Sequence, residues 1–112
     1  MDETIQFLKD VLDEVMALFP SKFIHIGGDE CPKVQWKADP FAQEKIKRLG
    51  LKNEHEMQSW FIRQMDGYLA GKGRRLIGWS EILEGGLAPG AALMVWLGNE
   101  GAEEAVKSGH DV

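Results

Sequence analysis

Three short apolar runs, separated by longer stretches with helical character, constrain the fold of this chain more than any other feature. The runs cover residues 23–26, 75–79 and 92–96, and each is too short to be a helix of ordinary length. The first run is closed by Gly27 and Gly28, a pair that is typical of a strand end. Strands that alternate with helices pair in parallel through right-handed crossovers. The pattern therefore predicts an α/β fold.

Helical patterns occupy most of the sequence between these runs. Asn53, followed three residues later by Glu56, resembles a capping box at the start of one helix. Pro32 and Pro40 interrupt any regular pattern in residues 29–40, so we expect that stretch to be irregular. Apolar residues at helical spacing, together with flanking Gly residues, predict helices at 4–19, 41–49, 53–70, 81–84 and 99–107.

The length of the chain limits how much of an α/β architecture it contains. Its 112 residues suit one compact domain, and no low-complexity linker divides them. A closed (β/α)8 barrel needs roughly 250 residues. We therefore expect residues 1–112 to form either an open α/β sheet or a single segment of a barrel that is incomplete at both ends.

Composition and charge exclude several classes of partner and site. With 13 basic and 18 acidic side chains the net charge is −5, and no basic cluster is interleaved with aromatic residues as nucleic-acid binding requires. No run of about 18 apolar residues predicts a membrane-spanning helix, and the opening residues lack the apolar core of a signal peptide. The single cysteine, Cys31, cannot form an internal disulfide or a thiolate metal cage.

Chemically useful side chains follow the ends of all three predicted strands. The first strand leads into the adjacent carboxylates Asp29 and Glu30, the second ends at Trp79, and the third ends at Trp96. Ligands of parallel α/β folds bind beyond the carboxyl ends of the strands. We therefore expect these four residues to lie close together at that edge of the sheet. That arrangement suits a sugar, because aromatic faces stack on its C–H surface while carboxylates transfer protons and form hydrogen bonds with its hydroxyls.

The adjacent acids predict a general acid next to an ionised partner. Repulsion between like charges, with partial burial, raises the proton affinity of one carboxylate, while the other stays ionised and stabilises positive charge. Gly27 and Gly28 permit the sharp turn that two neighbouring side chains need to face one pocket. The alternative is a solvated loop in which Asp29 caps a following turn, with Trp79 and Trp96 as core residues at the strand ends.

Three motifs at these strand ends resemble the hexosaminidases of glycoside hydrolase family 20. They are HIGGDE at 25–30, followed by Trp36, then GWSEI at 78–82 and MVWLG at 94–98. The resemblance covers nearly the whole chain, from the helix before the fourth barrel strand to the helix after the sixth. The fold class that it implies is α/β, as a partial (β/α)8 TIM barrel with about strands four to six and their flanking helices.

Substrate-assisted, retaining removal of terminal β-linked N-acetylhexosamine is the activity that this resemblance implies. The 2-acetamido oxygen of the sugar attacks its own anomeric carbon, Glu30 matches the general acid, and Asp29 matches the residue that orients the acetamido N–H. Trp79 and Trp96 match walls of the sugar pocket, and His25 matches an orienting residue behind the acids. The resemblance implies N-acetylhexosamine-containing glycans as partners, no metal and no cofactor, and a periplasmic, secreted or lysosomal location.

The chain departs from the family pattern at Cys31, Ser80 and Leu97. The resemblance also implies that family residues outside the chain complete the pocket. Ser80 and Leu97 stand where family members often have Asp and Arg, which predicts a change in efficiency or substrate range. Because the sugar-binding residues of the first and last barrel strands are absent, we expect the chain alone to be inactive and to self-associate through exposed edges. The alternatives are a non-catalytic fragment that binds N-acetyl sugars or self-assembles, and an open α/β sheet unrelated to barrels.

Overall fold

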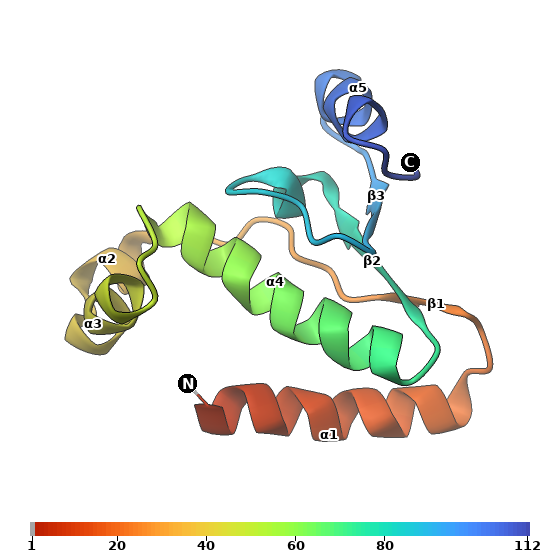
Figure 1. Cartoon of the computed structure of the whole chain (residues 1–112), viewed down its shortest axis with the longest axis horizontal. Coiled ribbons are helices and arrows are strands. Elements are labelled where there is room, and N and C mark those ends of the chain that lie inside the picture. Colours follow the sequence, from red (N-terminus) through yellow and green to blue (C-terminus); the bar gives the residue numbers. More distant parts are fainter. Residues whose placement is uncertain (1) are drawn as a thin grey trace.

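The computed structural model describes residues 2–112, which form helices around a small sheet (Figure 1). Helices and strands alternate as the sequence predicts, and a short 3-10 helix follows the second strand. No helix in residues 2–112 is long and apolar enough to span a membrane. In chain order the elements are α1 (Asp2–Leu18), β1 (Phe23–His25), α2 (Val34–Ala38), α3 (Pro40–Arg48), α4 (Glu54–Gly71), β2 (Arg75–Trp79), η1 (Ser80–Leu83), β3 (Ala92–Met94) and α5 (Glu100–Lys107).

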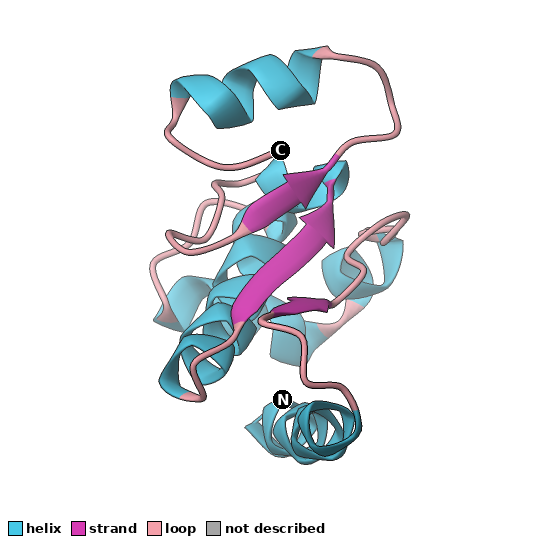
Figure 2. Ribbon diagram, turned by 90° about the vertical axis from the view of Figure 1, so that its right-hand side faces the viewer, coloured by secondary structure: helices cyan, strands magenta, loops and turns pink. Residues whose placement is uncertain are grey.

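The sheet contains three parallel strands whose order in space follows their order in the sequence, β1-β2-β3 (Figure 2). Ile24 of β1 lies opposite Leu76 of β2, and Gly78 of β2 lies opposite Leu93 of β3. After α5 the chain returns to the sheet, where the Asp111 carbonyl accepts a 2.9 Å hydrogen bond from the Leu93 N–H. The predicted α/β fold with parallel pairing is confirmed, and sequential neighbours are the order that one arc of a barrel requires.

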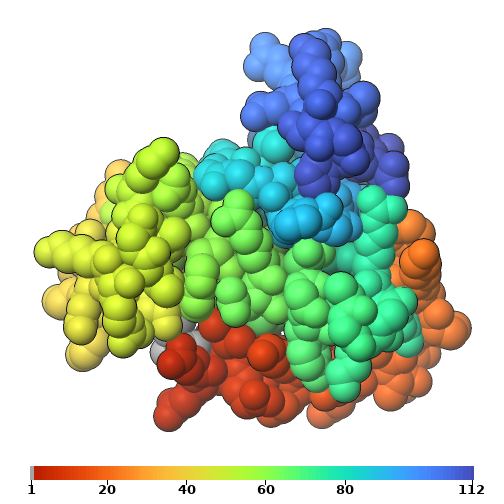
Figure 3. Space-filling model, viewed as in Figure 1, coloured from red at the N-terminus to blue at the C-terminus, as the bar shows by residue number. Residues whose placement is uncertain are grey.

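The core lies between α4 and the sheet, and α1 packs against α4 (Figure 1). In the space-filling view of Figure 3, α5 projects from one end of the body and the α2–α3 pair lies beside the start of α4. Full burial of a large apolar side chain stabilises the fold by about 1.5–3 kcal/mol. The buried side chains that join α4 and η1 to all three strands are Ile24, Ile62, Met65, Leu69, Leu76, Ile82 and Leu93.

The structure corrects the sequence interpretation in two places. Residues 29–40, expected to be irregular, contain the five-residue helix α2, and Pro40 is the first residue of α3. Asp39 is the N-cap of α3, and its carboxylate accepts a 3.0 Å hydrogen bond from a backbone N–H in the first turn. The third strand ends at Met94 and not at Trp96, so the last two residues of that apolar run lie beyond the sheet.

The guanidinium of Arg74 fixes the end of α1 to the start of β2. It donates hydrogen bonds to the carbonyls of Met16, Phe19 and Ser21, at 2.9, 2.8 and 2.5 Å. Carbonyls at a helix C-terminus lack partners within the helix, and the helix dipole favours a cation there. This contact therefore sets the position of the loop that leads from α1 into β1.

Tyr68 links α4 to α1, and its hydroxyl donates a 2.6 Å hydrogen bond to the Asp13 carboxylate. This bond, followed by desolvation and the negative charge of Asp13, raises the pKa of Tyr68 from 10.0 to about 12. Because the folded pKa lies above the unfolded one, the bond contributes fully to stability below about pH 10. Its contribution is then lost as the pH rises through the folded pKa of about 12.

An absorbance titration of the tyrosinate band tests this contact, since the chain contains a single tyrosine. We expect a midpoint at about 12 in the unmodified chain. Asp13→Asn should move the midpoint of Tyr68 down towards the ordinary value of about 10, because the charged acceptor is gone. Asp10→Asn is the matched control, and it should leave most of the upward shift in place. A midpoint of about 10 in the unmodified chain would show that the bond to Asp13 does not form in solution.

Candidate active site

The carboxyl ends of β1 and β2 place the predicted site residues at one edge of the sheet. Pairing continues just past β1, because the Trp79 N–H donates a 2.9 Å hydrogen bond to the Gly27 carbonyl. Gly27 and Gly28 then take positive φ values of 76° and 94°, which glycine adopts without steric cost. The expected turn is therefore present, and it leads directly into Asp29 and Glu30.

Asp29, Glu30, Trp79 and Trp96 line one hollow with a volume of about 330 Å³. The two acids follow β1, Trp79 ends β2, and Trp96 follows β3. Three neighbouring strand ends therefore contribute to a single site, as expected for a parallel sheet. The hollow is open, because both acids are exposed and Trp96 is 49% exposed.

His25 stands next to this hollow without lining it. Its Nδ1 accepts a 3.0 Å hydrogen bond from the Gly27 N–H, so Nδ1 carries no proton in this contact. The imidazole also packs edge-on against Trp79, with ring centroids 4.8 Å apart and an interplanar angle of 61°. His25 thus joins the turn before the acids to the aromatic wall of the hollow.

Glu30 is the non-glycine residue with a positive φ, 45°, in the part of the chain that the structure describes. The left-handed conformation costs a residue with a Cβ roughly 1–2 kcal/mol. Surrounding contacts must therefore hold Glu30 in place, and strain of this kind concentrates at functional sites. The irregular backbone lets consecutive side chains, Asp29 and Glu30, line the same hollow. No group of three or more His, Cys, Asp or Glu side chains within residues 2–112 is arranged to hold a metal ion.

Glu81 holds the indole of Trp96 at the edge of the hollow. The Trp96 Nε1–H donates to the two carboxylate oxygens of Glu81, at 3.1 and 3.2 Å. Glu81 belongs to the motif GWSEI, but the sequence alone assigns it no role. The contact joins residues 15 positions apart, and only the fold brings them together.

Ile82 of η1 packs directly against glycines of two motifs. A Cβ on Gly28 would lie 2.4 Å from Ile82 Cγ2, and a Cβ on Gly78 would lie 2.6 Å from Ile82 Cδ1. Carbon atoms do not approach each other so closely, so both positions require glycine. These glycines therefore have a packing role at the strand ends in addition to any role in the turn.

A polar contact from α4 ties down the loop that carries the acids, which we call the acid loop (residues 28–33). Gln58 is only 4% exposed, and its Nε2 donates a 3.1 Å hydrogen bond to the Gly28 carbonyl. Its Oε1 accepts a hydrogen bond from Lys33 Nζ, which also donates to the Cys31 carbonyl at 2.6 Å. The sequence signal for this contact is a glutamine at helical spacing within the apolar stripe of α4.

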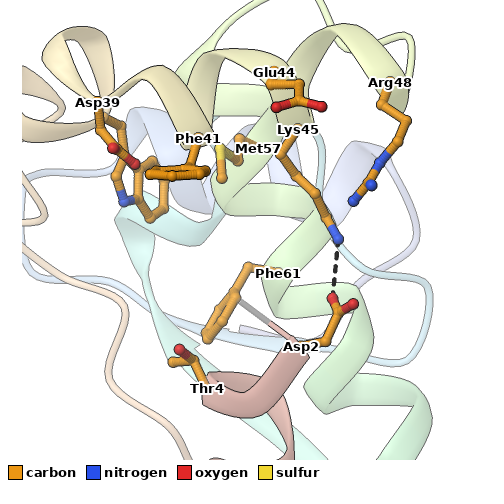
Figure 4. Close-up of a pocket in the computed structure, with 10 residues that line it drawn as sticks. Asp2, Thr4, Asp39, Phe41, Glu44, Lys45, Arg48, Met57 and Phe61 are labelled. Atoms are coloured by element: carbon orange, nitrogen blue, oxygen red, sulfur yellow. Dashed lines mark hydrogen bonds and ion pairs between the residues drawn. The ribbon is translucent and has the colours of Figure 1, made fainter.

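A larger pocket, of about 460 Å³, lies between the start of α1, α3 and α4 (Figure 4). Trp36 and Phe41 line it, so Trp36 faces this pocket and not the hollow of the two acids. Three of its polar groups are already engaged. Lys45 pairs with Asp2 at 3.0 Å and lowers the pKa of that carboxyl, while Asp39 caps α3. Among residues 2–112, no two consecutive carboxylates line this pocket. The hollow at the strand ends is therefore the candidate active site.

All residues of the chain, 1–112, match the sequence profile of the family described as "Glycosyl hydrolase family 20, catalytic domain". A β-hexosaminidase of Porphyromonas gingivalis is 53% identical over 111 residues, which are 99% of this chain and 14% of that protein. A β-hexosaminidase of Vibrio furnissii is 36% identical over 97% of this chain and 18% of that protein. The chain thus spans less than a fifth of the length of these two relatives.

Solved structures agree with this match over nearly the whole chain. A β-N-acetylhexosaminidase from Bacteroides fragilis aligns with a TM-score of 0.90 and 35% identity, over 98% of this chain and 23% of its own. A chitobiase from Flavobacterium johnsoniae aligns with a TM-score of 0.91 and 37% identity, over 98% of this chain and 18% of its own. Because the family match covers every residue and the structures agree over nearly all of them, the chain belongs to glycosyl hydrolase family 20, in its catalytic domain.

Proposed function

We propose that the chain is the central segment of a catalytic (β/α)8 barrel, incomplete at both ends, in which β1, β2 and β3 are barrel strands four, five and six. The sequential order of three parallel strands supports this assignment. Further support comes from matched enzymes that align with nearly the whole chain, although the chain covers less than a quarter of each. The hollow lies at the carboxyl ends of the strands, where barrel enzymes have their active sites.

The activity that we propose for the complete domain is removal of terminal β-linked N-acetylhexosamine from glycans, with retention of configuration. The observation that carries this proposal is one hollow in which two consecutive carboxylates meet two indole rings. Relatives named β-hexosaminidase and a structure named chitobiase support the substrate class.

Glu30 acts as the general acid and then as the general base. In the first step the acetamido oxygen of the sugar attacks the anomeric carbon, the bond to the leaving oxygen breaks, and Glu30 donates its proton to that oxygen. In the second step Glu30 accepts a proton from water, whose oxygen attacks the anomeric carbon. The bond from the acetamido oxygen then breaks, and the acetamido group is restored.

The Asp29 carboxylate accepts a hydrogen bond from the acetamido N–H, and its negative charge stabilises the positive cyclic intermediate. Trp79 and Trp96 supply aromatic faces for the acetamido methyl and the sugar ring. His25 positions the turn and the wall through its contacts with the Gly27 N–H and Trp79. The site therefore uses one proton carrier, one fixed anion and two apolar surfaces.

A chromogenic N-acetyl-β-glucosaminide tests this proposal. The complete domain should release the chromophore, whereas the isolated 112-residue chain should release little or none, because its hollow is open and both acids are exposed. The corresponding glucoside lacks the acetamido nucleophile and should not be cleaved by the complete domain. Turnover by the isolated chain close to that of the complete domain would contradict the barrel-segment proposal. Equal cleavage of the glucoside would contradict the substrate-assisted step.

A fragment that binds N-acetyl sugars without cleaving them is the second candidate, and the open hollow is the observation that favours it. Binding of N-acetylglucosamine by the complete domain without any turnover would support this alternative. Self-association through the outer strands stays a prediction, supported by the exposed side chains of Phe23 and Met94 on β1 and β3.

A further inference from the structure

We propose that Gln58 and Lys33 are positioning residues that hold the acid loop in the conformation in which Asp29 and Glu30 face the hollow. The inference rests on the proposed function, and it adds two residues outside the three motifs. The hydrogen bonds that support it form one continuous chain. They run from the Gly28 carbonyl through the Gln58 amide to the Lys33 ammonium, and from there to a second carbonyl of the loop.

Gln58 provides a rigid anchor for this chain of hydrogen bonds. It lies on α4, an 18-residue helix whose buried face forms the core with the sheet. Gln58 is 96% buried as a residue. Its amide nitrogen donates to the Gly28 carbonyl, and its amide oxygen accepts from Lys33. Leaving a buried amide without hydrogen-bond partners costs free energy. The side chain therefore has one favourable orientation, and its hydrogen bonds fix the position of the loop.

Lys33 closes the other end of the acid loop. Two of the three donors of its ammonium group are used by Gln58 and by the Cys31 carbonyl. The ammonium also lies 6.0 Å from the centroid of the Trp36 ring, at the outer limit of a cation–π contact. The ammonium group therefore has three contacts, and through Gln58 it ties the loop to α4.

The acid loop requires such restraint because its backbone has few other bonds. Within residues 2–112, the backbone groups of residues 29–32 make no hydrogen bond other than the one from Lys33 to the Cys31 carbonyl. Glu30 nevertheless occupies the left-handed region, with φ of 45°. A strained conformation persists only where its surroundings determine it, and Gln58 and Lys33 are the polar groups that do so here.

Backbone order parameters from 15N relaxation of the 112-residue chain test the tether directly. Gln58→Met keeps the length and burial of the side chain and removes its hydrogen bonds. In this variant we expect the order parameters of Asp29 and Glu30 to fall from about 0.85 to below about 0.6. Gln64→Met is the matched control on the same helix and should leave them unchanged. Unchanged order parameters in Gln58→Met would overturn the inference.

Lys33→Met is the second variant, because it leaves the bond from Gln58 to Gly28 intact and alters a half-buried position. It should loosen the acid loop in the same way, and Lys33→Arg should restore order, since a guanidinium donates to both acceptors. Lys37→Met, one helical turn further along the chain, should have no effect. Order that persists in Lys33→Met would remove Lys33 from the proposal.

Kinetics of the complete domain separate positioning from folding. Gln58→Met and Lys33→Met should lower kcat per folded molecule by about 10- to 100-fold with little change in KM, because misplacement of a catalytic group by about 1 Å has effects of this size. Lys33→Arg should recover most of the loss. If the unmodified domain is active and both Met variants match their controls, the positioning inference fails and the proposed function stands. If the unmodified domain is inactive, the proposed function fails, and the order parameters still decide whether the tether exists.

Discussion

Replacing Glu30 with glutamine in the complete catalytic domain should lower kcat for N-acetyl-β-glucosaminides by about 10²–10⁴-fold. The glutamine amide keeps the shape of the side chain but does not donate a proton to the leaving oxygen or accept one from water. Affinity for N-acetylglucosamine should change little, because Asp29, Trp79 and Trp96 still line the hollow. The defect is therefore expected in the chemical step and not in binding.

Glu44→Gln is the control for this experiment, because Glu44 lines the larger pocket between α1, α3 and α4. Its replacement should leave both kcat and KM unchanged. Turnover that survives in Glu30→Gln would remove Glu30 from the catalytic machinery. A loss of turnover in Glu44→Gln alone would instead indicate that the reaction takes place in the larger pocket.

Gly28→Ala should lower the free energy of unfolding by about 2–4 kcal/mol. Two costs add at this position. The new Cβ would lie 2.4 Å from Cγ2 of Ile82, and alanine would have to adopt a φ of +94°. Ile82 is 1% exposed and has little room to move. Urea unfolding of the 112-residue chain, followed by tryptophan fluorescence, measures the loss.

Gly67→Ala is the matched control, because a Cβ at this position in α4 meets no atom within 4 Å. It should raise the free energy of unfolding by about 0.5–1 kcal/mol, as expected for glycine in a helix interior. The clash is isolated in the double variant Gly28→Ala/Ile82→Ala, whose total loss should be smaller than the sum of the two single losses. Additive losses, or a Gly28→Ala variant as stable as the unmodified chain, would contradict the close packing at this glycine.

Much of the fold could be predicted because its signals are local. Apolar runs of strand length and flanking glycines marked β1 and β2, and the Asn53–Glu56 pattern marked the start of α4, where Asn53 accepts a hydrogen bond from the Glu56 N–H. The helix α2 has five residues, too few for a periodic pattern, and it lies between two prolines. The end of β3 depends on its partner, since Met94 pairs with Trp79, the last residue of β2.

The residues of the candidate site also fall into two groups, those visible in the sequence and those that only the folded chain reveals. The two acids and the two tryptophans are visible in the sequence because each lies at the end of a strand or a few residues beyond it, and a parallel sheet brings such ends together. Gln58 and Lys33 act through contacts between distant parts of the sequence. The bond between these two residues spans 25 positions, and the bond from Gln58 to Gly28 spans 30. Glu81, which follows β2, likewise accepts a hydrogen bond from Trp96, which follows β3. A sequence pattern shows that a glutamine interrupts an apolar stripe, but the carbonyl that it binds is defined only by the folded chain.

The decisive measurement is a crystal structure of the complete domain with N-acetylglucosamine bound. We expect the sugar ring in the hollow lined by Asp29, Glu30, Trp79 and Trp96. The acetamido N–H should donate a hydrogen bond to the Asp29 carboxylate, and Glu30 should lie beside the anomeric oxygen. A sugar bound instead among the residues of the larger pocket, or acids that point away from it on separate surfaces, would contradict the assignment of this site.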